Sequence, residues 1–311
     1  MTVTFGGKVM TWAPALLTER MGFAEEEGLD VEHIVSQQGT ASALAALISG
    51  STDAVLAGAP ASMAPVREGA PVKLIGGPLV GYGVEITVSN EFLKRAGVTL
   101  DDPLDKRIAA LRGAKLGIYN PGDSVDQLYR AILPKAGIDP DRDVEIVTLQ
   151  NAAGELAALA KGQIDAMGAS PPGGAQAEQE KFGTILIDGR EVPGLDVYPY
   201  GVLSVNTRDL TGDKAELIKS YVRALNKALQ TIRDDPESTK RHLHEEFPDL
   251  DDFTFDITFE DMRRSMPDSL ELSEDRFQSL AKFAKDQGKD LGLDYGELID
   301  TTLVKSALDG K

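Results

Sequence analysis

Residues 117–133, GIYNPGDSVDQLYRAIL, combine a short apolar strand, a turn of small residues and the start of a helix. The turn Asn120–Ser124 would therefore place a helix N-terminus directly after a strand. Such a helix end offers N–H groups and about half a positive charge, so it can hold an anionic group without Lys or Arg. Neither GxGxxG nor GxxxxGK[ST] occurs in this stretch, so it does not match the common nucleotide-binding loops.

Four further turns are built from small or hydroxyl residues and follow strand-like stretches: 11–13, 38–42, 58–62 and 170–172. Ligands of open parallel sheets bind beyond the carboxyl ends of the strands, so turns of this kind are candidate walls of a ligand site. With two tyrosines added, the predicted ligand-binding residues are Trp12, Gln38, Gly39, Thr40, Ala59, Pro60, Ser62, Tyr82, Pro121, Gly122, Ser124, Ser170, Pro171 and Tyr200.

Each of these residues also has a structural interpretation. Ser and Thr at helix starts commonly act as N-caps. Trp12 either stacks on a ligand or belongs to the core, and Tyr82 and Tyr200 either contact ligand or pack between segments. Asp123 either caps its own helix, or faces the ligand and repels an anion. Glu85 could bind a ligand donor, although an ordinary strand position is the simpler interpretation.

Residues for catalysis are scarce. The histidines are His33, on a strand, and His242 and His244, in a charged helix, and none follows a candidate turn. HExxH, GxSxG and acidic clusters at metal-ligand spacing are absent from the sequence, and so is cysteine. We therefore predict no catalytic residues, no metal site and no cofactor.

An internal repeat indicates how these turns are positioned. LAALISGSTDA, residues 44–54, matches LAALAKGQIDA, residues 156–166, at an offset of 112 residues. Each copy lies in a β-α-β-α-β pattern, which predicts parallel strands with helices on both faces and hence two similar lobes. Asp53 and Asp165 correspond in the repeat. Each begins a strand at the end away from the ligand turns, so both are interpreted as structural.

The expected fold is α/β, with two β-α-β-α-β lobes joined by two extended crossovers and with C-terminal helices packed on lobe one. We expect lobe one to contain residues 1–85 and 206–311, and lobe two, with the crossovers, residues 86–205. The crossovers contain the β-rich runs 84–88 and 202–205. Helices are expected at 214–233, 236–246, 258–265, 273–287 and 296–308.

Composition limits the class of partner. The chain has 311 residues, 42% of them hydrophobic, and a formal charge of −18, so it would repel nucleic acid and anionic membranes. No apolar run reaches the ~18 residues of a membrane span. The sequence alone fits a cytoplasmic protein, and it fits equally an extracytoplasmic protein whose signal peptide has been removed.

Several segments resemble the extracytoplasmic solute-binding proteins of ABC importers, in the group for taurine, alkanesulfonates, nitrate and thiamine pyrimidine precursors. MGFAEEEGLDVEHIV, ALISGSTDAVLAG, REGAPVKLIG and LRGAKLGIYNPGDS are similar to signature segments of that group, and the resemblance covers residues 1 to about 250. It implies a type II periplasmic-binding fold with the ligand between the lobes. Thr40, Ser62, Ser124 and Pro171 match positions or turns that contact ligand in the family.

The resemblance implies a non-enzymatic, monomeric protein that binds a small organic solute and delivers it to an ABC permease. The helix starts favour a carboxylate or sulfonate, and Trp12, Tyr82 and Tyr200 favour an aromatic body. The alternative is an enzyme on the same fold, similar to those of thiamine or menaquinone biosynthesis. The thiamine-pathway enzyme carries a Cys-rich motif and an active-site His that this sequence lacks. A regulator's effector domain is a further alternative, which the negative charge disfavours.

Overall fold

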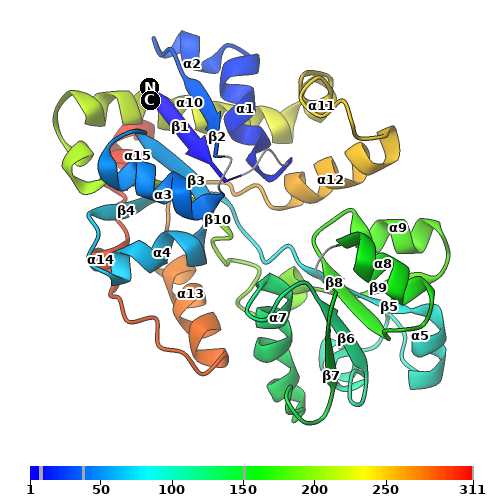
Figure 1. The fold of residues 1–311 in the computed structure, drawn as a ribbon. Helices are drawn as coiled ribbons and strands as arrows, with labels where there is room; N and C mark the ends of the chain where they lie inside the picture. The colour runs from blue at the N-terminus through cyan, green and yellow to red at the C-terminus, as the bar shows by residue number, and fades with distance from the viewer. Residues whose placement is uncertain (7–9, 37–38, 150–151, 310–311) are drawn as a thin grey trace. The chain divides into compact units, whose positions relative to one another are not determined.

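The structure is a computed structural model that describes residues 1–6, 10–36, 39–149 and 152–309. It divides the chain into two compact units, coloured along the chain in Figure 1. The first unit contains residues 1–80, 199–278 and 292–311, and the second contains residues 81–198 and 279–291. Residues 279–291 thus differ from the expectation that all of 206–311 belongs with the first lobe.

The first unit is built on a mixed five-stranded sheet in the order β2-β1-β3-β10-β4. Strand β1 lies between β2 and β3 and runs parallel to both, as the β-α-β-α-β pattern predicts, whereas β10 is antiparallel to both β3 and β4. The β-rich run of the second crossover, residues 202–205, therefore forms strand β10 of this sheet. The strands are β1 (Thr2–Phe5), β2 (Glu32–Val35), β3 (Ala54–Gly58), β4 (Val72–Leu79) and β10 (Gly201–Asn206).

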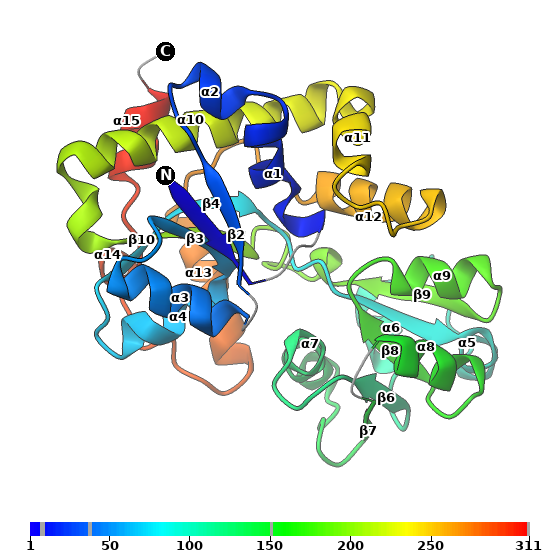
Figure 2. The same cartoon turned by 45° about the horizontal axis from the view of Figure 1, so that its top comes forward.

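Helices cover both faces of this sheet. Val3 and Phe5 of β1 pack with α1 and α10, and the alternate residues Val55 and Ala57 of β3 pack with α3. Figure 2 shows α10 passing α1 and α15, with α3 and α4 on the other side of the sheet. The helices are η1 (Met10–Trp12), α1 (Ala13–Arg20), α2 (Phe23–Glu26), α3 (Thr40–Ser49), α4 (Ala59–Arg67), η4 (Thr207–Leu210), α10 (Gly212–Asp234), α11 (Pro236–His244), α12 (Asp252–Arg264), α14 (Tyr295–Leu298) and α15 (Thr302–Leu308).

Two helix boundaries differ from the sequence prediction. α12 begins at Asp252 rather than at 258, because the Asp251 side chain accepts a hydrogen bond from the Thr254 N–H and caps the helix. The helix expected at 296–308 is divided into α14 and α15. The chain is extended at Ile299, which forms a β-bridge with Leu74 and so interrupts the helical path.

The second unit repeats the same plan. Its sheet has the order β7-β6-β8-β5-β9, with β6 parallel to β7 and β8, and with β5 antiparallel to β8 and β9. The crossover strand occupies the same place in both sheets, next to the third strand of each repeat. The elements are β5 (Glu85–Ser89), α5 (Asn90–Ala96), α6 (Leu104–Ala109), β6 (Lys115–Ile118), α7 (Ser124–Ile132), η2 (Leu133–Ala136), β7 (Glu145–Thr148), α8 (Ala152–Ala160), β8 (Ala166–Ala169), α9 (Gly173–Gln179), β9 (Gly183–Asp188) and η3 (Gly189–Glu191).

Helix α13 (Glu274–Asp286) ends in the second unit. Its Phe283 ring packs against Tyr82 and Tyr198 at centroid distances of 4.8 and 5.2 Å. The Asp286 carboxylate also pairs with Lys135 at 3.1 Å. These contacts with segments far away in the sequence explain why residues 279–291 group with the second unit.

The repeated aspartates make the same contact in both units. Asp53 Oδ2 accepts a hydrogen bond from the Thr2 N–H at 2.8 Å, and Asp165 Oδ2 accepts one from the Lys115 N–H at 2.9 Å. Lys214 and Arg95 pair with the respective carboxylates. Each aspartate therefore joins the start of the third strand to the start of the first. This confirms the structural role predicted from the repeat.

We expect Asp53→Asn to lower the free energy of unfolding at pH 7 by about 1–2 kcal/mol, because Lys214 loses its charged partner. This expected loss of stability is small for a hydrogen bond between charged groups, because Lys214 is half exposed and its charge is screened by solvent. Burial alone would raise the pKa of Asp53, but hydrogen bonds from Lys214 and the Thr2 N–H outweigh it and hold the pKa below its usual value.

A lowered pKa stabilises the fold above the pKa of the unfolded chain, about 3.9, and this stabilisation is lost as the pH falls through the folded pKa. Urea unfolding at pH 7, 5, 4 and 3 should therefore show the wild type and Asp53→Asn converging in acid. The control is Asp101→Asn, at an exposed position. Equal losses for both variants would contradict the role assigned to Asp53.

Candidate functional site

In the first unit, helices α3 and α4 both begin at the carboxyl ends of sheet strands, after β2 and β3. The N-cap residues are Gly39, with a positive φ of 79°, and Gly58, and neither helix start has a side-chain cap. The two helices lie next to each other on the same face of the sheet. Two helix N-termini without side-chain caps thus lie at one edge of this unit, where partial positive charge accumulates.

Thr40 is the first residue of α3 and is half-buried. The segment that leaves β1 passes very close to it, since a Cβ atom on Gly6 would lie 2.4 Å from Thr40 Oγ1. Glycine at position 6 is therefore what lets the chain run beside this hydroxyl. Gly39 is the N-cap itself, and the predicted contact Gln38 lies outside the described residues.

At the start of α4, the Ala59 N–H donates to the carbonyl of Tyr200 at 3.2 Å, which brings the predicted residue Tyr200 beside this helix end. Pro60 is exposed at the second helical position. Ser62 is 0% exposed, and its hydroxyl has no hydrogen-bond partner among the described residues. Ala59, Pro60 and Tyr200 are thus brought together, whereas Ser62 lies beneath the surface.

In the second unit, the N-terminus of α7 is capped by carboxylate side chains of its own turn. Asp123 is the N-cap: Oδ1 accepts from the Asp126 N–H at 2.8 Å, and Oδ2 accepts from the N–H groups of Tyr119 and Asn120, both at 2.9 Å. Asp126 in turn accepts from the Gly122 N–H at 2.7 Å. This answers the question of how Asp123 is used. It caps the helix and organises the turn, and it occupies N–H groups that an anion would otherwise bind.

The predicted residues of this turn are accessible to different degrees. Pro121 and Gly122 are exposed, Gly122 with a φ of 84°, and Ser124 is half-buried. Tyr82 is only 2% exposed, and its hydroxyl donates to the Ser124 carbonyl at 2.9 Å. Tyr82 also packs edge-on against Tyr198 at 5.2 Å. The packing interpretation of Tyr82 therefore fits its surroundings. Through its hydroxyl, the residue also holds the last residue of the Asn120–Ser124 turn in place.

The last predicted turn of the second unit lies between β8 and α9. Ser170 is exposed and Pro171 is half-buried, with a cis bond between Pro171 and Pro172. Glu85 is buried in β5, and a Cβ on Gly174 would lie 2.8 Å from its Oε2. Glycine at 174 therefore gives the Glu85 carboxyl its space.

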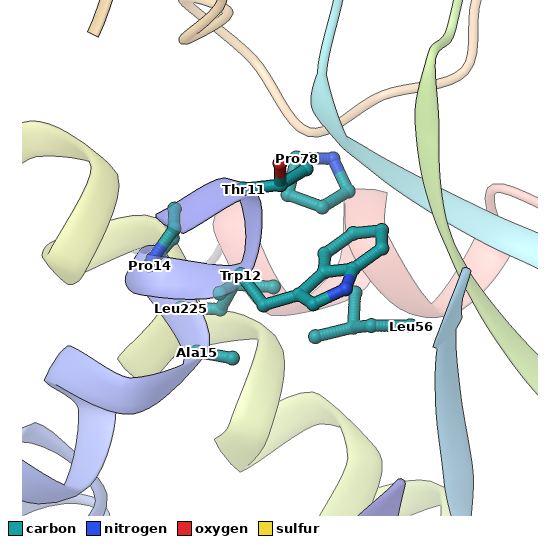
Figure 3. A pocket seen from close by; sticks show the side chains of 7 residues that line it. All are labelled: Thr11, Trp12, Pro14, Ala15, Leu56, Pro78 and Leu225. Carbon is teal, nitrogen blue, oxygen red and sulfur yellow. The ribbon is translucent and has the colours of Figure 1, made fainter. Parts of the chain in front are cut away.

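Trp12 lies within the first unit at 9% exposure. Figure 3 shows its ring in a narrow pocket formed with Thr11, Pro14, Ala15, Leu56, Pro78 and Leu225. The pocket has no room for a water molecule, and Gly201 lies so near that a Cβ there would be 3.0 Å from the ring. These contacts are those of a core aromatic residue.

The histidines lie away from these turns. His33 contacts Glu19, Nδ1 to Oε2 at 3.2 Å, beside the Arg20–Glu246 ion pair. Burial lowers the pKa of His33, although Glu19 opposes this. Across the described residues, no group of three or more His, Cys, Asp or Glu is placed to hold a metal ion. Within that same part of the chain, none of the helices combines the length and apolarity needed to cross a bilayer.

Sequence reasoning missed Glu155, in the first turn of α8. Its side chain is 0% exposed, and burial, with the nearby Asp123 carboxylate, raises its pKa to about 8. The same surroundings raise the pKa of the buried Tyr129 hydroxyl. The repeat carried a signal for this position, because the offset of 112 residues aligns Glu155 with Ala43, which is buried in the first unit.

Comparison with known proteins identifies related chains. The profile of the NMT1-like family matches residues 2–244. The putative binding protein YtlA of Bacillus subtilis is 22% identical over 305 residues, covering 96% of this chain and 87% of that protein.

Two solved structures share the fold. The ligand-binding component of an ABC-type import system from Staphylococcus aureus, with zinc bound, has a TM-score of 0.72 at 15% identity, covering 99% of this chain and 98% of the other. The alkanesulfonate-binding protein SsuA from Xanthomonas axonopodis pv. citri, bound to MOPS, has a TM-score of 0.64 at 20% identity, covering 99% and 96%. These findings confirm the predicted fold and the resemblance to solute-binding proteins of ABC importers.

The packing of Trp12 predicts a stability effect. We expect Trp12→Ala to lower the free energy of unfolding by about 3–5 kcal/mol, because it removes a large ring from a packed core. The matched control is Leu217→Ala, at an exposed apolar position of α10 in the same unit, with an expected change of about 0.5 kcal/mol. Urea unfolding followed by far-ultraviolet circular dichroism measures both. If Trp12→Ala kept its stability, the core assignment would be wrong.

Proposed function

This chain belongs to the NMT1-like family, and from that premise we propose that it binds a small organic carboxylate or sulfonate and delivers it to the permease of an ABC importer. The named relatives are a putative binding protein, a ligand-binding component and an alkanesulfonate-binding protein, rather than enzymes. The observation that carries the proposal is the pair of neighbouring helix N-termini in the first unit, α3 and α4, which both lack side-chain caps.

The anionic group of the ligand would be held by the first unit. The start of α3 has no side-chain cap on its N–H groups. At the start of α4 the Ala59 N–H already donates to the Tyr200 carbonyl and Pro60 has no N–H, so α4 contributes mainly the partial positive charge of its N-terminus. The Thr40 hydroxyl, beside the glycine at position 6, is placed to donate one further hydrogen bond. Sulfonate and carboxylate groups accept several such bonds at once, which suits this arrangement without a Lys or Arg.

The second unit would contact the uncharged or hydrogen-bond-donating part of the ligand. Because Asp123 and Asp126 occupy N–H groups of their turn, this turn is a poor site for a second anionic group. Pro121, Gly122 and Ser124 are accessible around it. We therefore propose a ligand with a single anionic group and a compact body. The aromatic body expected from Trp12 and Tyr82 has less support, since both rings are packed in the interior.

The family relatives are consistent with an organic ligand. One neighbour is described as bound to MOPS, a sulfonate, and another as bound to zinc. This chain has no cysteine, and the described residues hold no His, Asp and Glu group suited to a metal, which favours the organic ligand. We also propose that the protein is monomeric and works outside the cytoplasm, as a protein that meets a membrane permease from outside must.

We expect a thermal-shift screen over short alkanesulfonates, aliphatic carboxylates and aromatic acids to find stabilisation by a sulfonate or carboxylate. A ligand at 100 times its dissociation constant adds about 2.7 kcal/mol to the free energy of unfolding. Thr40→Val should then weaken binding by about 1.5–3 kcal/mol, since the valine keeps the size of the side chain and removes one hydrogen bond to a charged group. Isothermal titration calorimetry measures this loss.

The matched control is Thr302→Val, which also changes the first residue of a first-unit helix, α15, at an exposed position. It should leave affinity unchanged. If both valine variants bound equally well, Thr40 would be no more than the start of a helix. Mass spectrometry of each stabilising compound after incubation should show no product, and any turnover would favour the enzyme alternative instead.

A further inference from the structure

Glu155 is a buried carboxyl group for which the described part of the chain offers no hydrogen-bond partner. Its side chain is 0% exposed, and neither carboxyl oxygen has a hydrogen-bond partner among the described residues. It lies against β6, where a Cβ on Gly117 would be only 3.0 Å from Oε1. Glycine at this strand position therefore makes the space that the carboxyl group fills.

This environment is unfavourable to a charge. An ionised carboxylate removed from water, with no donor and no cation beside it, carries a desolvation cost that protonation avoids. The negative charge of Asp123 acts in the same direction. A protonated Glu155 is the form that the geometry stabilises, and burial followed by Asp123 raises its pKa to about 8.

Asp123 is also the residue that organises the proposed ligand turn. Its carboxylate accepts hydrogen bonds from the N–H groups of Tyr119, Asn120 and Asp126, and so holds the chain between β6 and α7 in place. A second negative charge close to this carboxylate would raise the energy of the capped turn. The protonation state of Glu155 therefore affects the stability of the capped Asn120–Ser124 turn.

Other titratable groups lie on elements that adjoin this pair, and Asp126 of the same turn is paired with Arg130 at 2.9 Å. From α7, the Tyr129 hydroxyl is buried and lacks a partner in the described structure, and burial, together with Glu155 and Asp123, raises its pKa. From β5, which α8 also contacts, Glu85 is another buried carboxyl group. β6 presents Gly117. Tyr129, Glu85 and Gly117 supply no positive charge that would favour the ionised form.

We propose that Glu155 is a positioning residue that is carried as a neutral carboxylic acid in the native second unit and, through Asp123, sets the pH range in which the Asn120–Ser124 turn accepts a ligand. The part that concerns ligand rests on the proposed function. Below the titration midpoint the turn is fully capped. Above it, the Glu155 charge repels Asp123 and raises the energy of the capped turn, so affinity falls.

The first experiment needs no ligand. Carbon-13 NMR of the glutamate carboxyls in the full chain, titrated from pH 4 to 10, should show Glu155 changing near pH 8 rather than near pH 4.5. Asp123→Asn should lower this midpoint, and the exposed control Asp101→Asn should not. A Glu155 signal that titrates below pH 6 in the wild type would overturn the proposal.

The second experiment reads the turn itself. The amide shifts of Asn120 and Gly122 should move with the Glu155 midpoint in the wild type and stay unchanged over pH 7–9 in Glu155→Gln. The glutamine keeps the size of the side chain and removes the titration. Identical pH profiles of these amides in both proteins would show that Glu155 does not act on the turn, and would overturn the coupling.

The third experiment adds ethanesulfonate as a probe. Calorimetric affinity should fall above the midpoint by up to tenfold per pH unit in the wild type and remain level in Glu155→Gln. Parallel profiles in the two proteins would contradict the coupling to binding. If ethanesulfonate bound to neither protein at any pH, the proposed ligand class would fail, while the carboxyl and amide titrations would still decide the role of Glu155.

Discussion

The constraint on which this structure depends is the need of each helix N-terminus for hydrogen-bond acceptors. In both units, parallel strands deliver the chain into helices at the carboxyl edge of a sheet, and the first N–H groups of those helices have no partner within the helix. The first unit leaves α3 and α4 without side-chain caps, after glycine. The second unit caps α7 with Asp123 and ties the turn further with Asp126. The turn before α7 therefore satisfies its donors internally, whereas α3 and α4 in the first unit, like α9 in the second, have no side-chain cap.

Much of the fold follows from the repeat and from turn chemistry. The β-α-β-α-β order of each half, the glycines that end α3 and α8, and the contacts of Asp53 and Asp165 are all local features, which a sequence pattern encodes directly. The assignment of residues 279–291 could not be predicted in this way. It depends on Phe283 meeting Tyr82 and Tyr198, residues that are distant along the chain. Periodicity shows that a helix exists and does not show which core receives it.

The candidate site was predictable only at the level of turns. Small and hydroxyl residues indicate where helices start after strands, but the type of a residue does not show where its side chain points. Ser62 and Thr40 look alike in sequence, yet Ser62 is buried within α4 and Thr40 is half-buried at the start of α3. Trp12 and Tyr82 are large rings near turns, and both are used for packing. Glu155 was detectable only by aligning it with the buried Ala43 of the other copy.

The two copies thus share a scaffold and differ in the groups that they place at their helix starts. After its first strand the second copy carries Asp123 and Asp126, the latter paired with Arg130, and at the position of Ala43 it carries the buried Glu155. The first copy keeps glycine N-caps and adds the Thr40 hydroxyl. Each taken by itself, the starts of α3 and α4 would attract an anionic group more strongly than the carboxylate-capped turn before α7 would. Duplication followed by divergence of the residues at the helix starts is in this way sufficient to give two similar units different electrostatic properties.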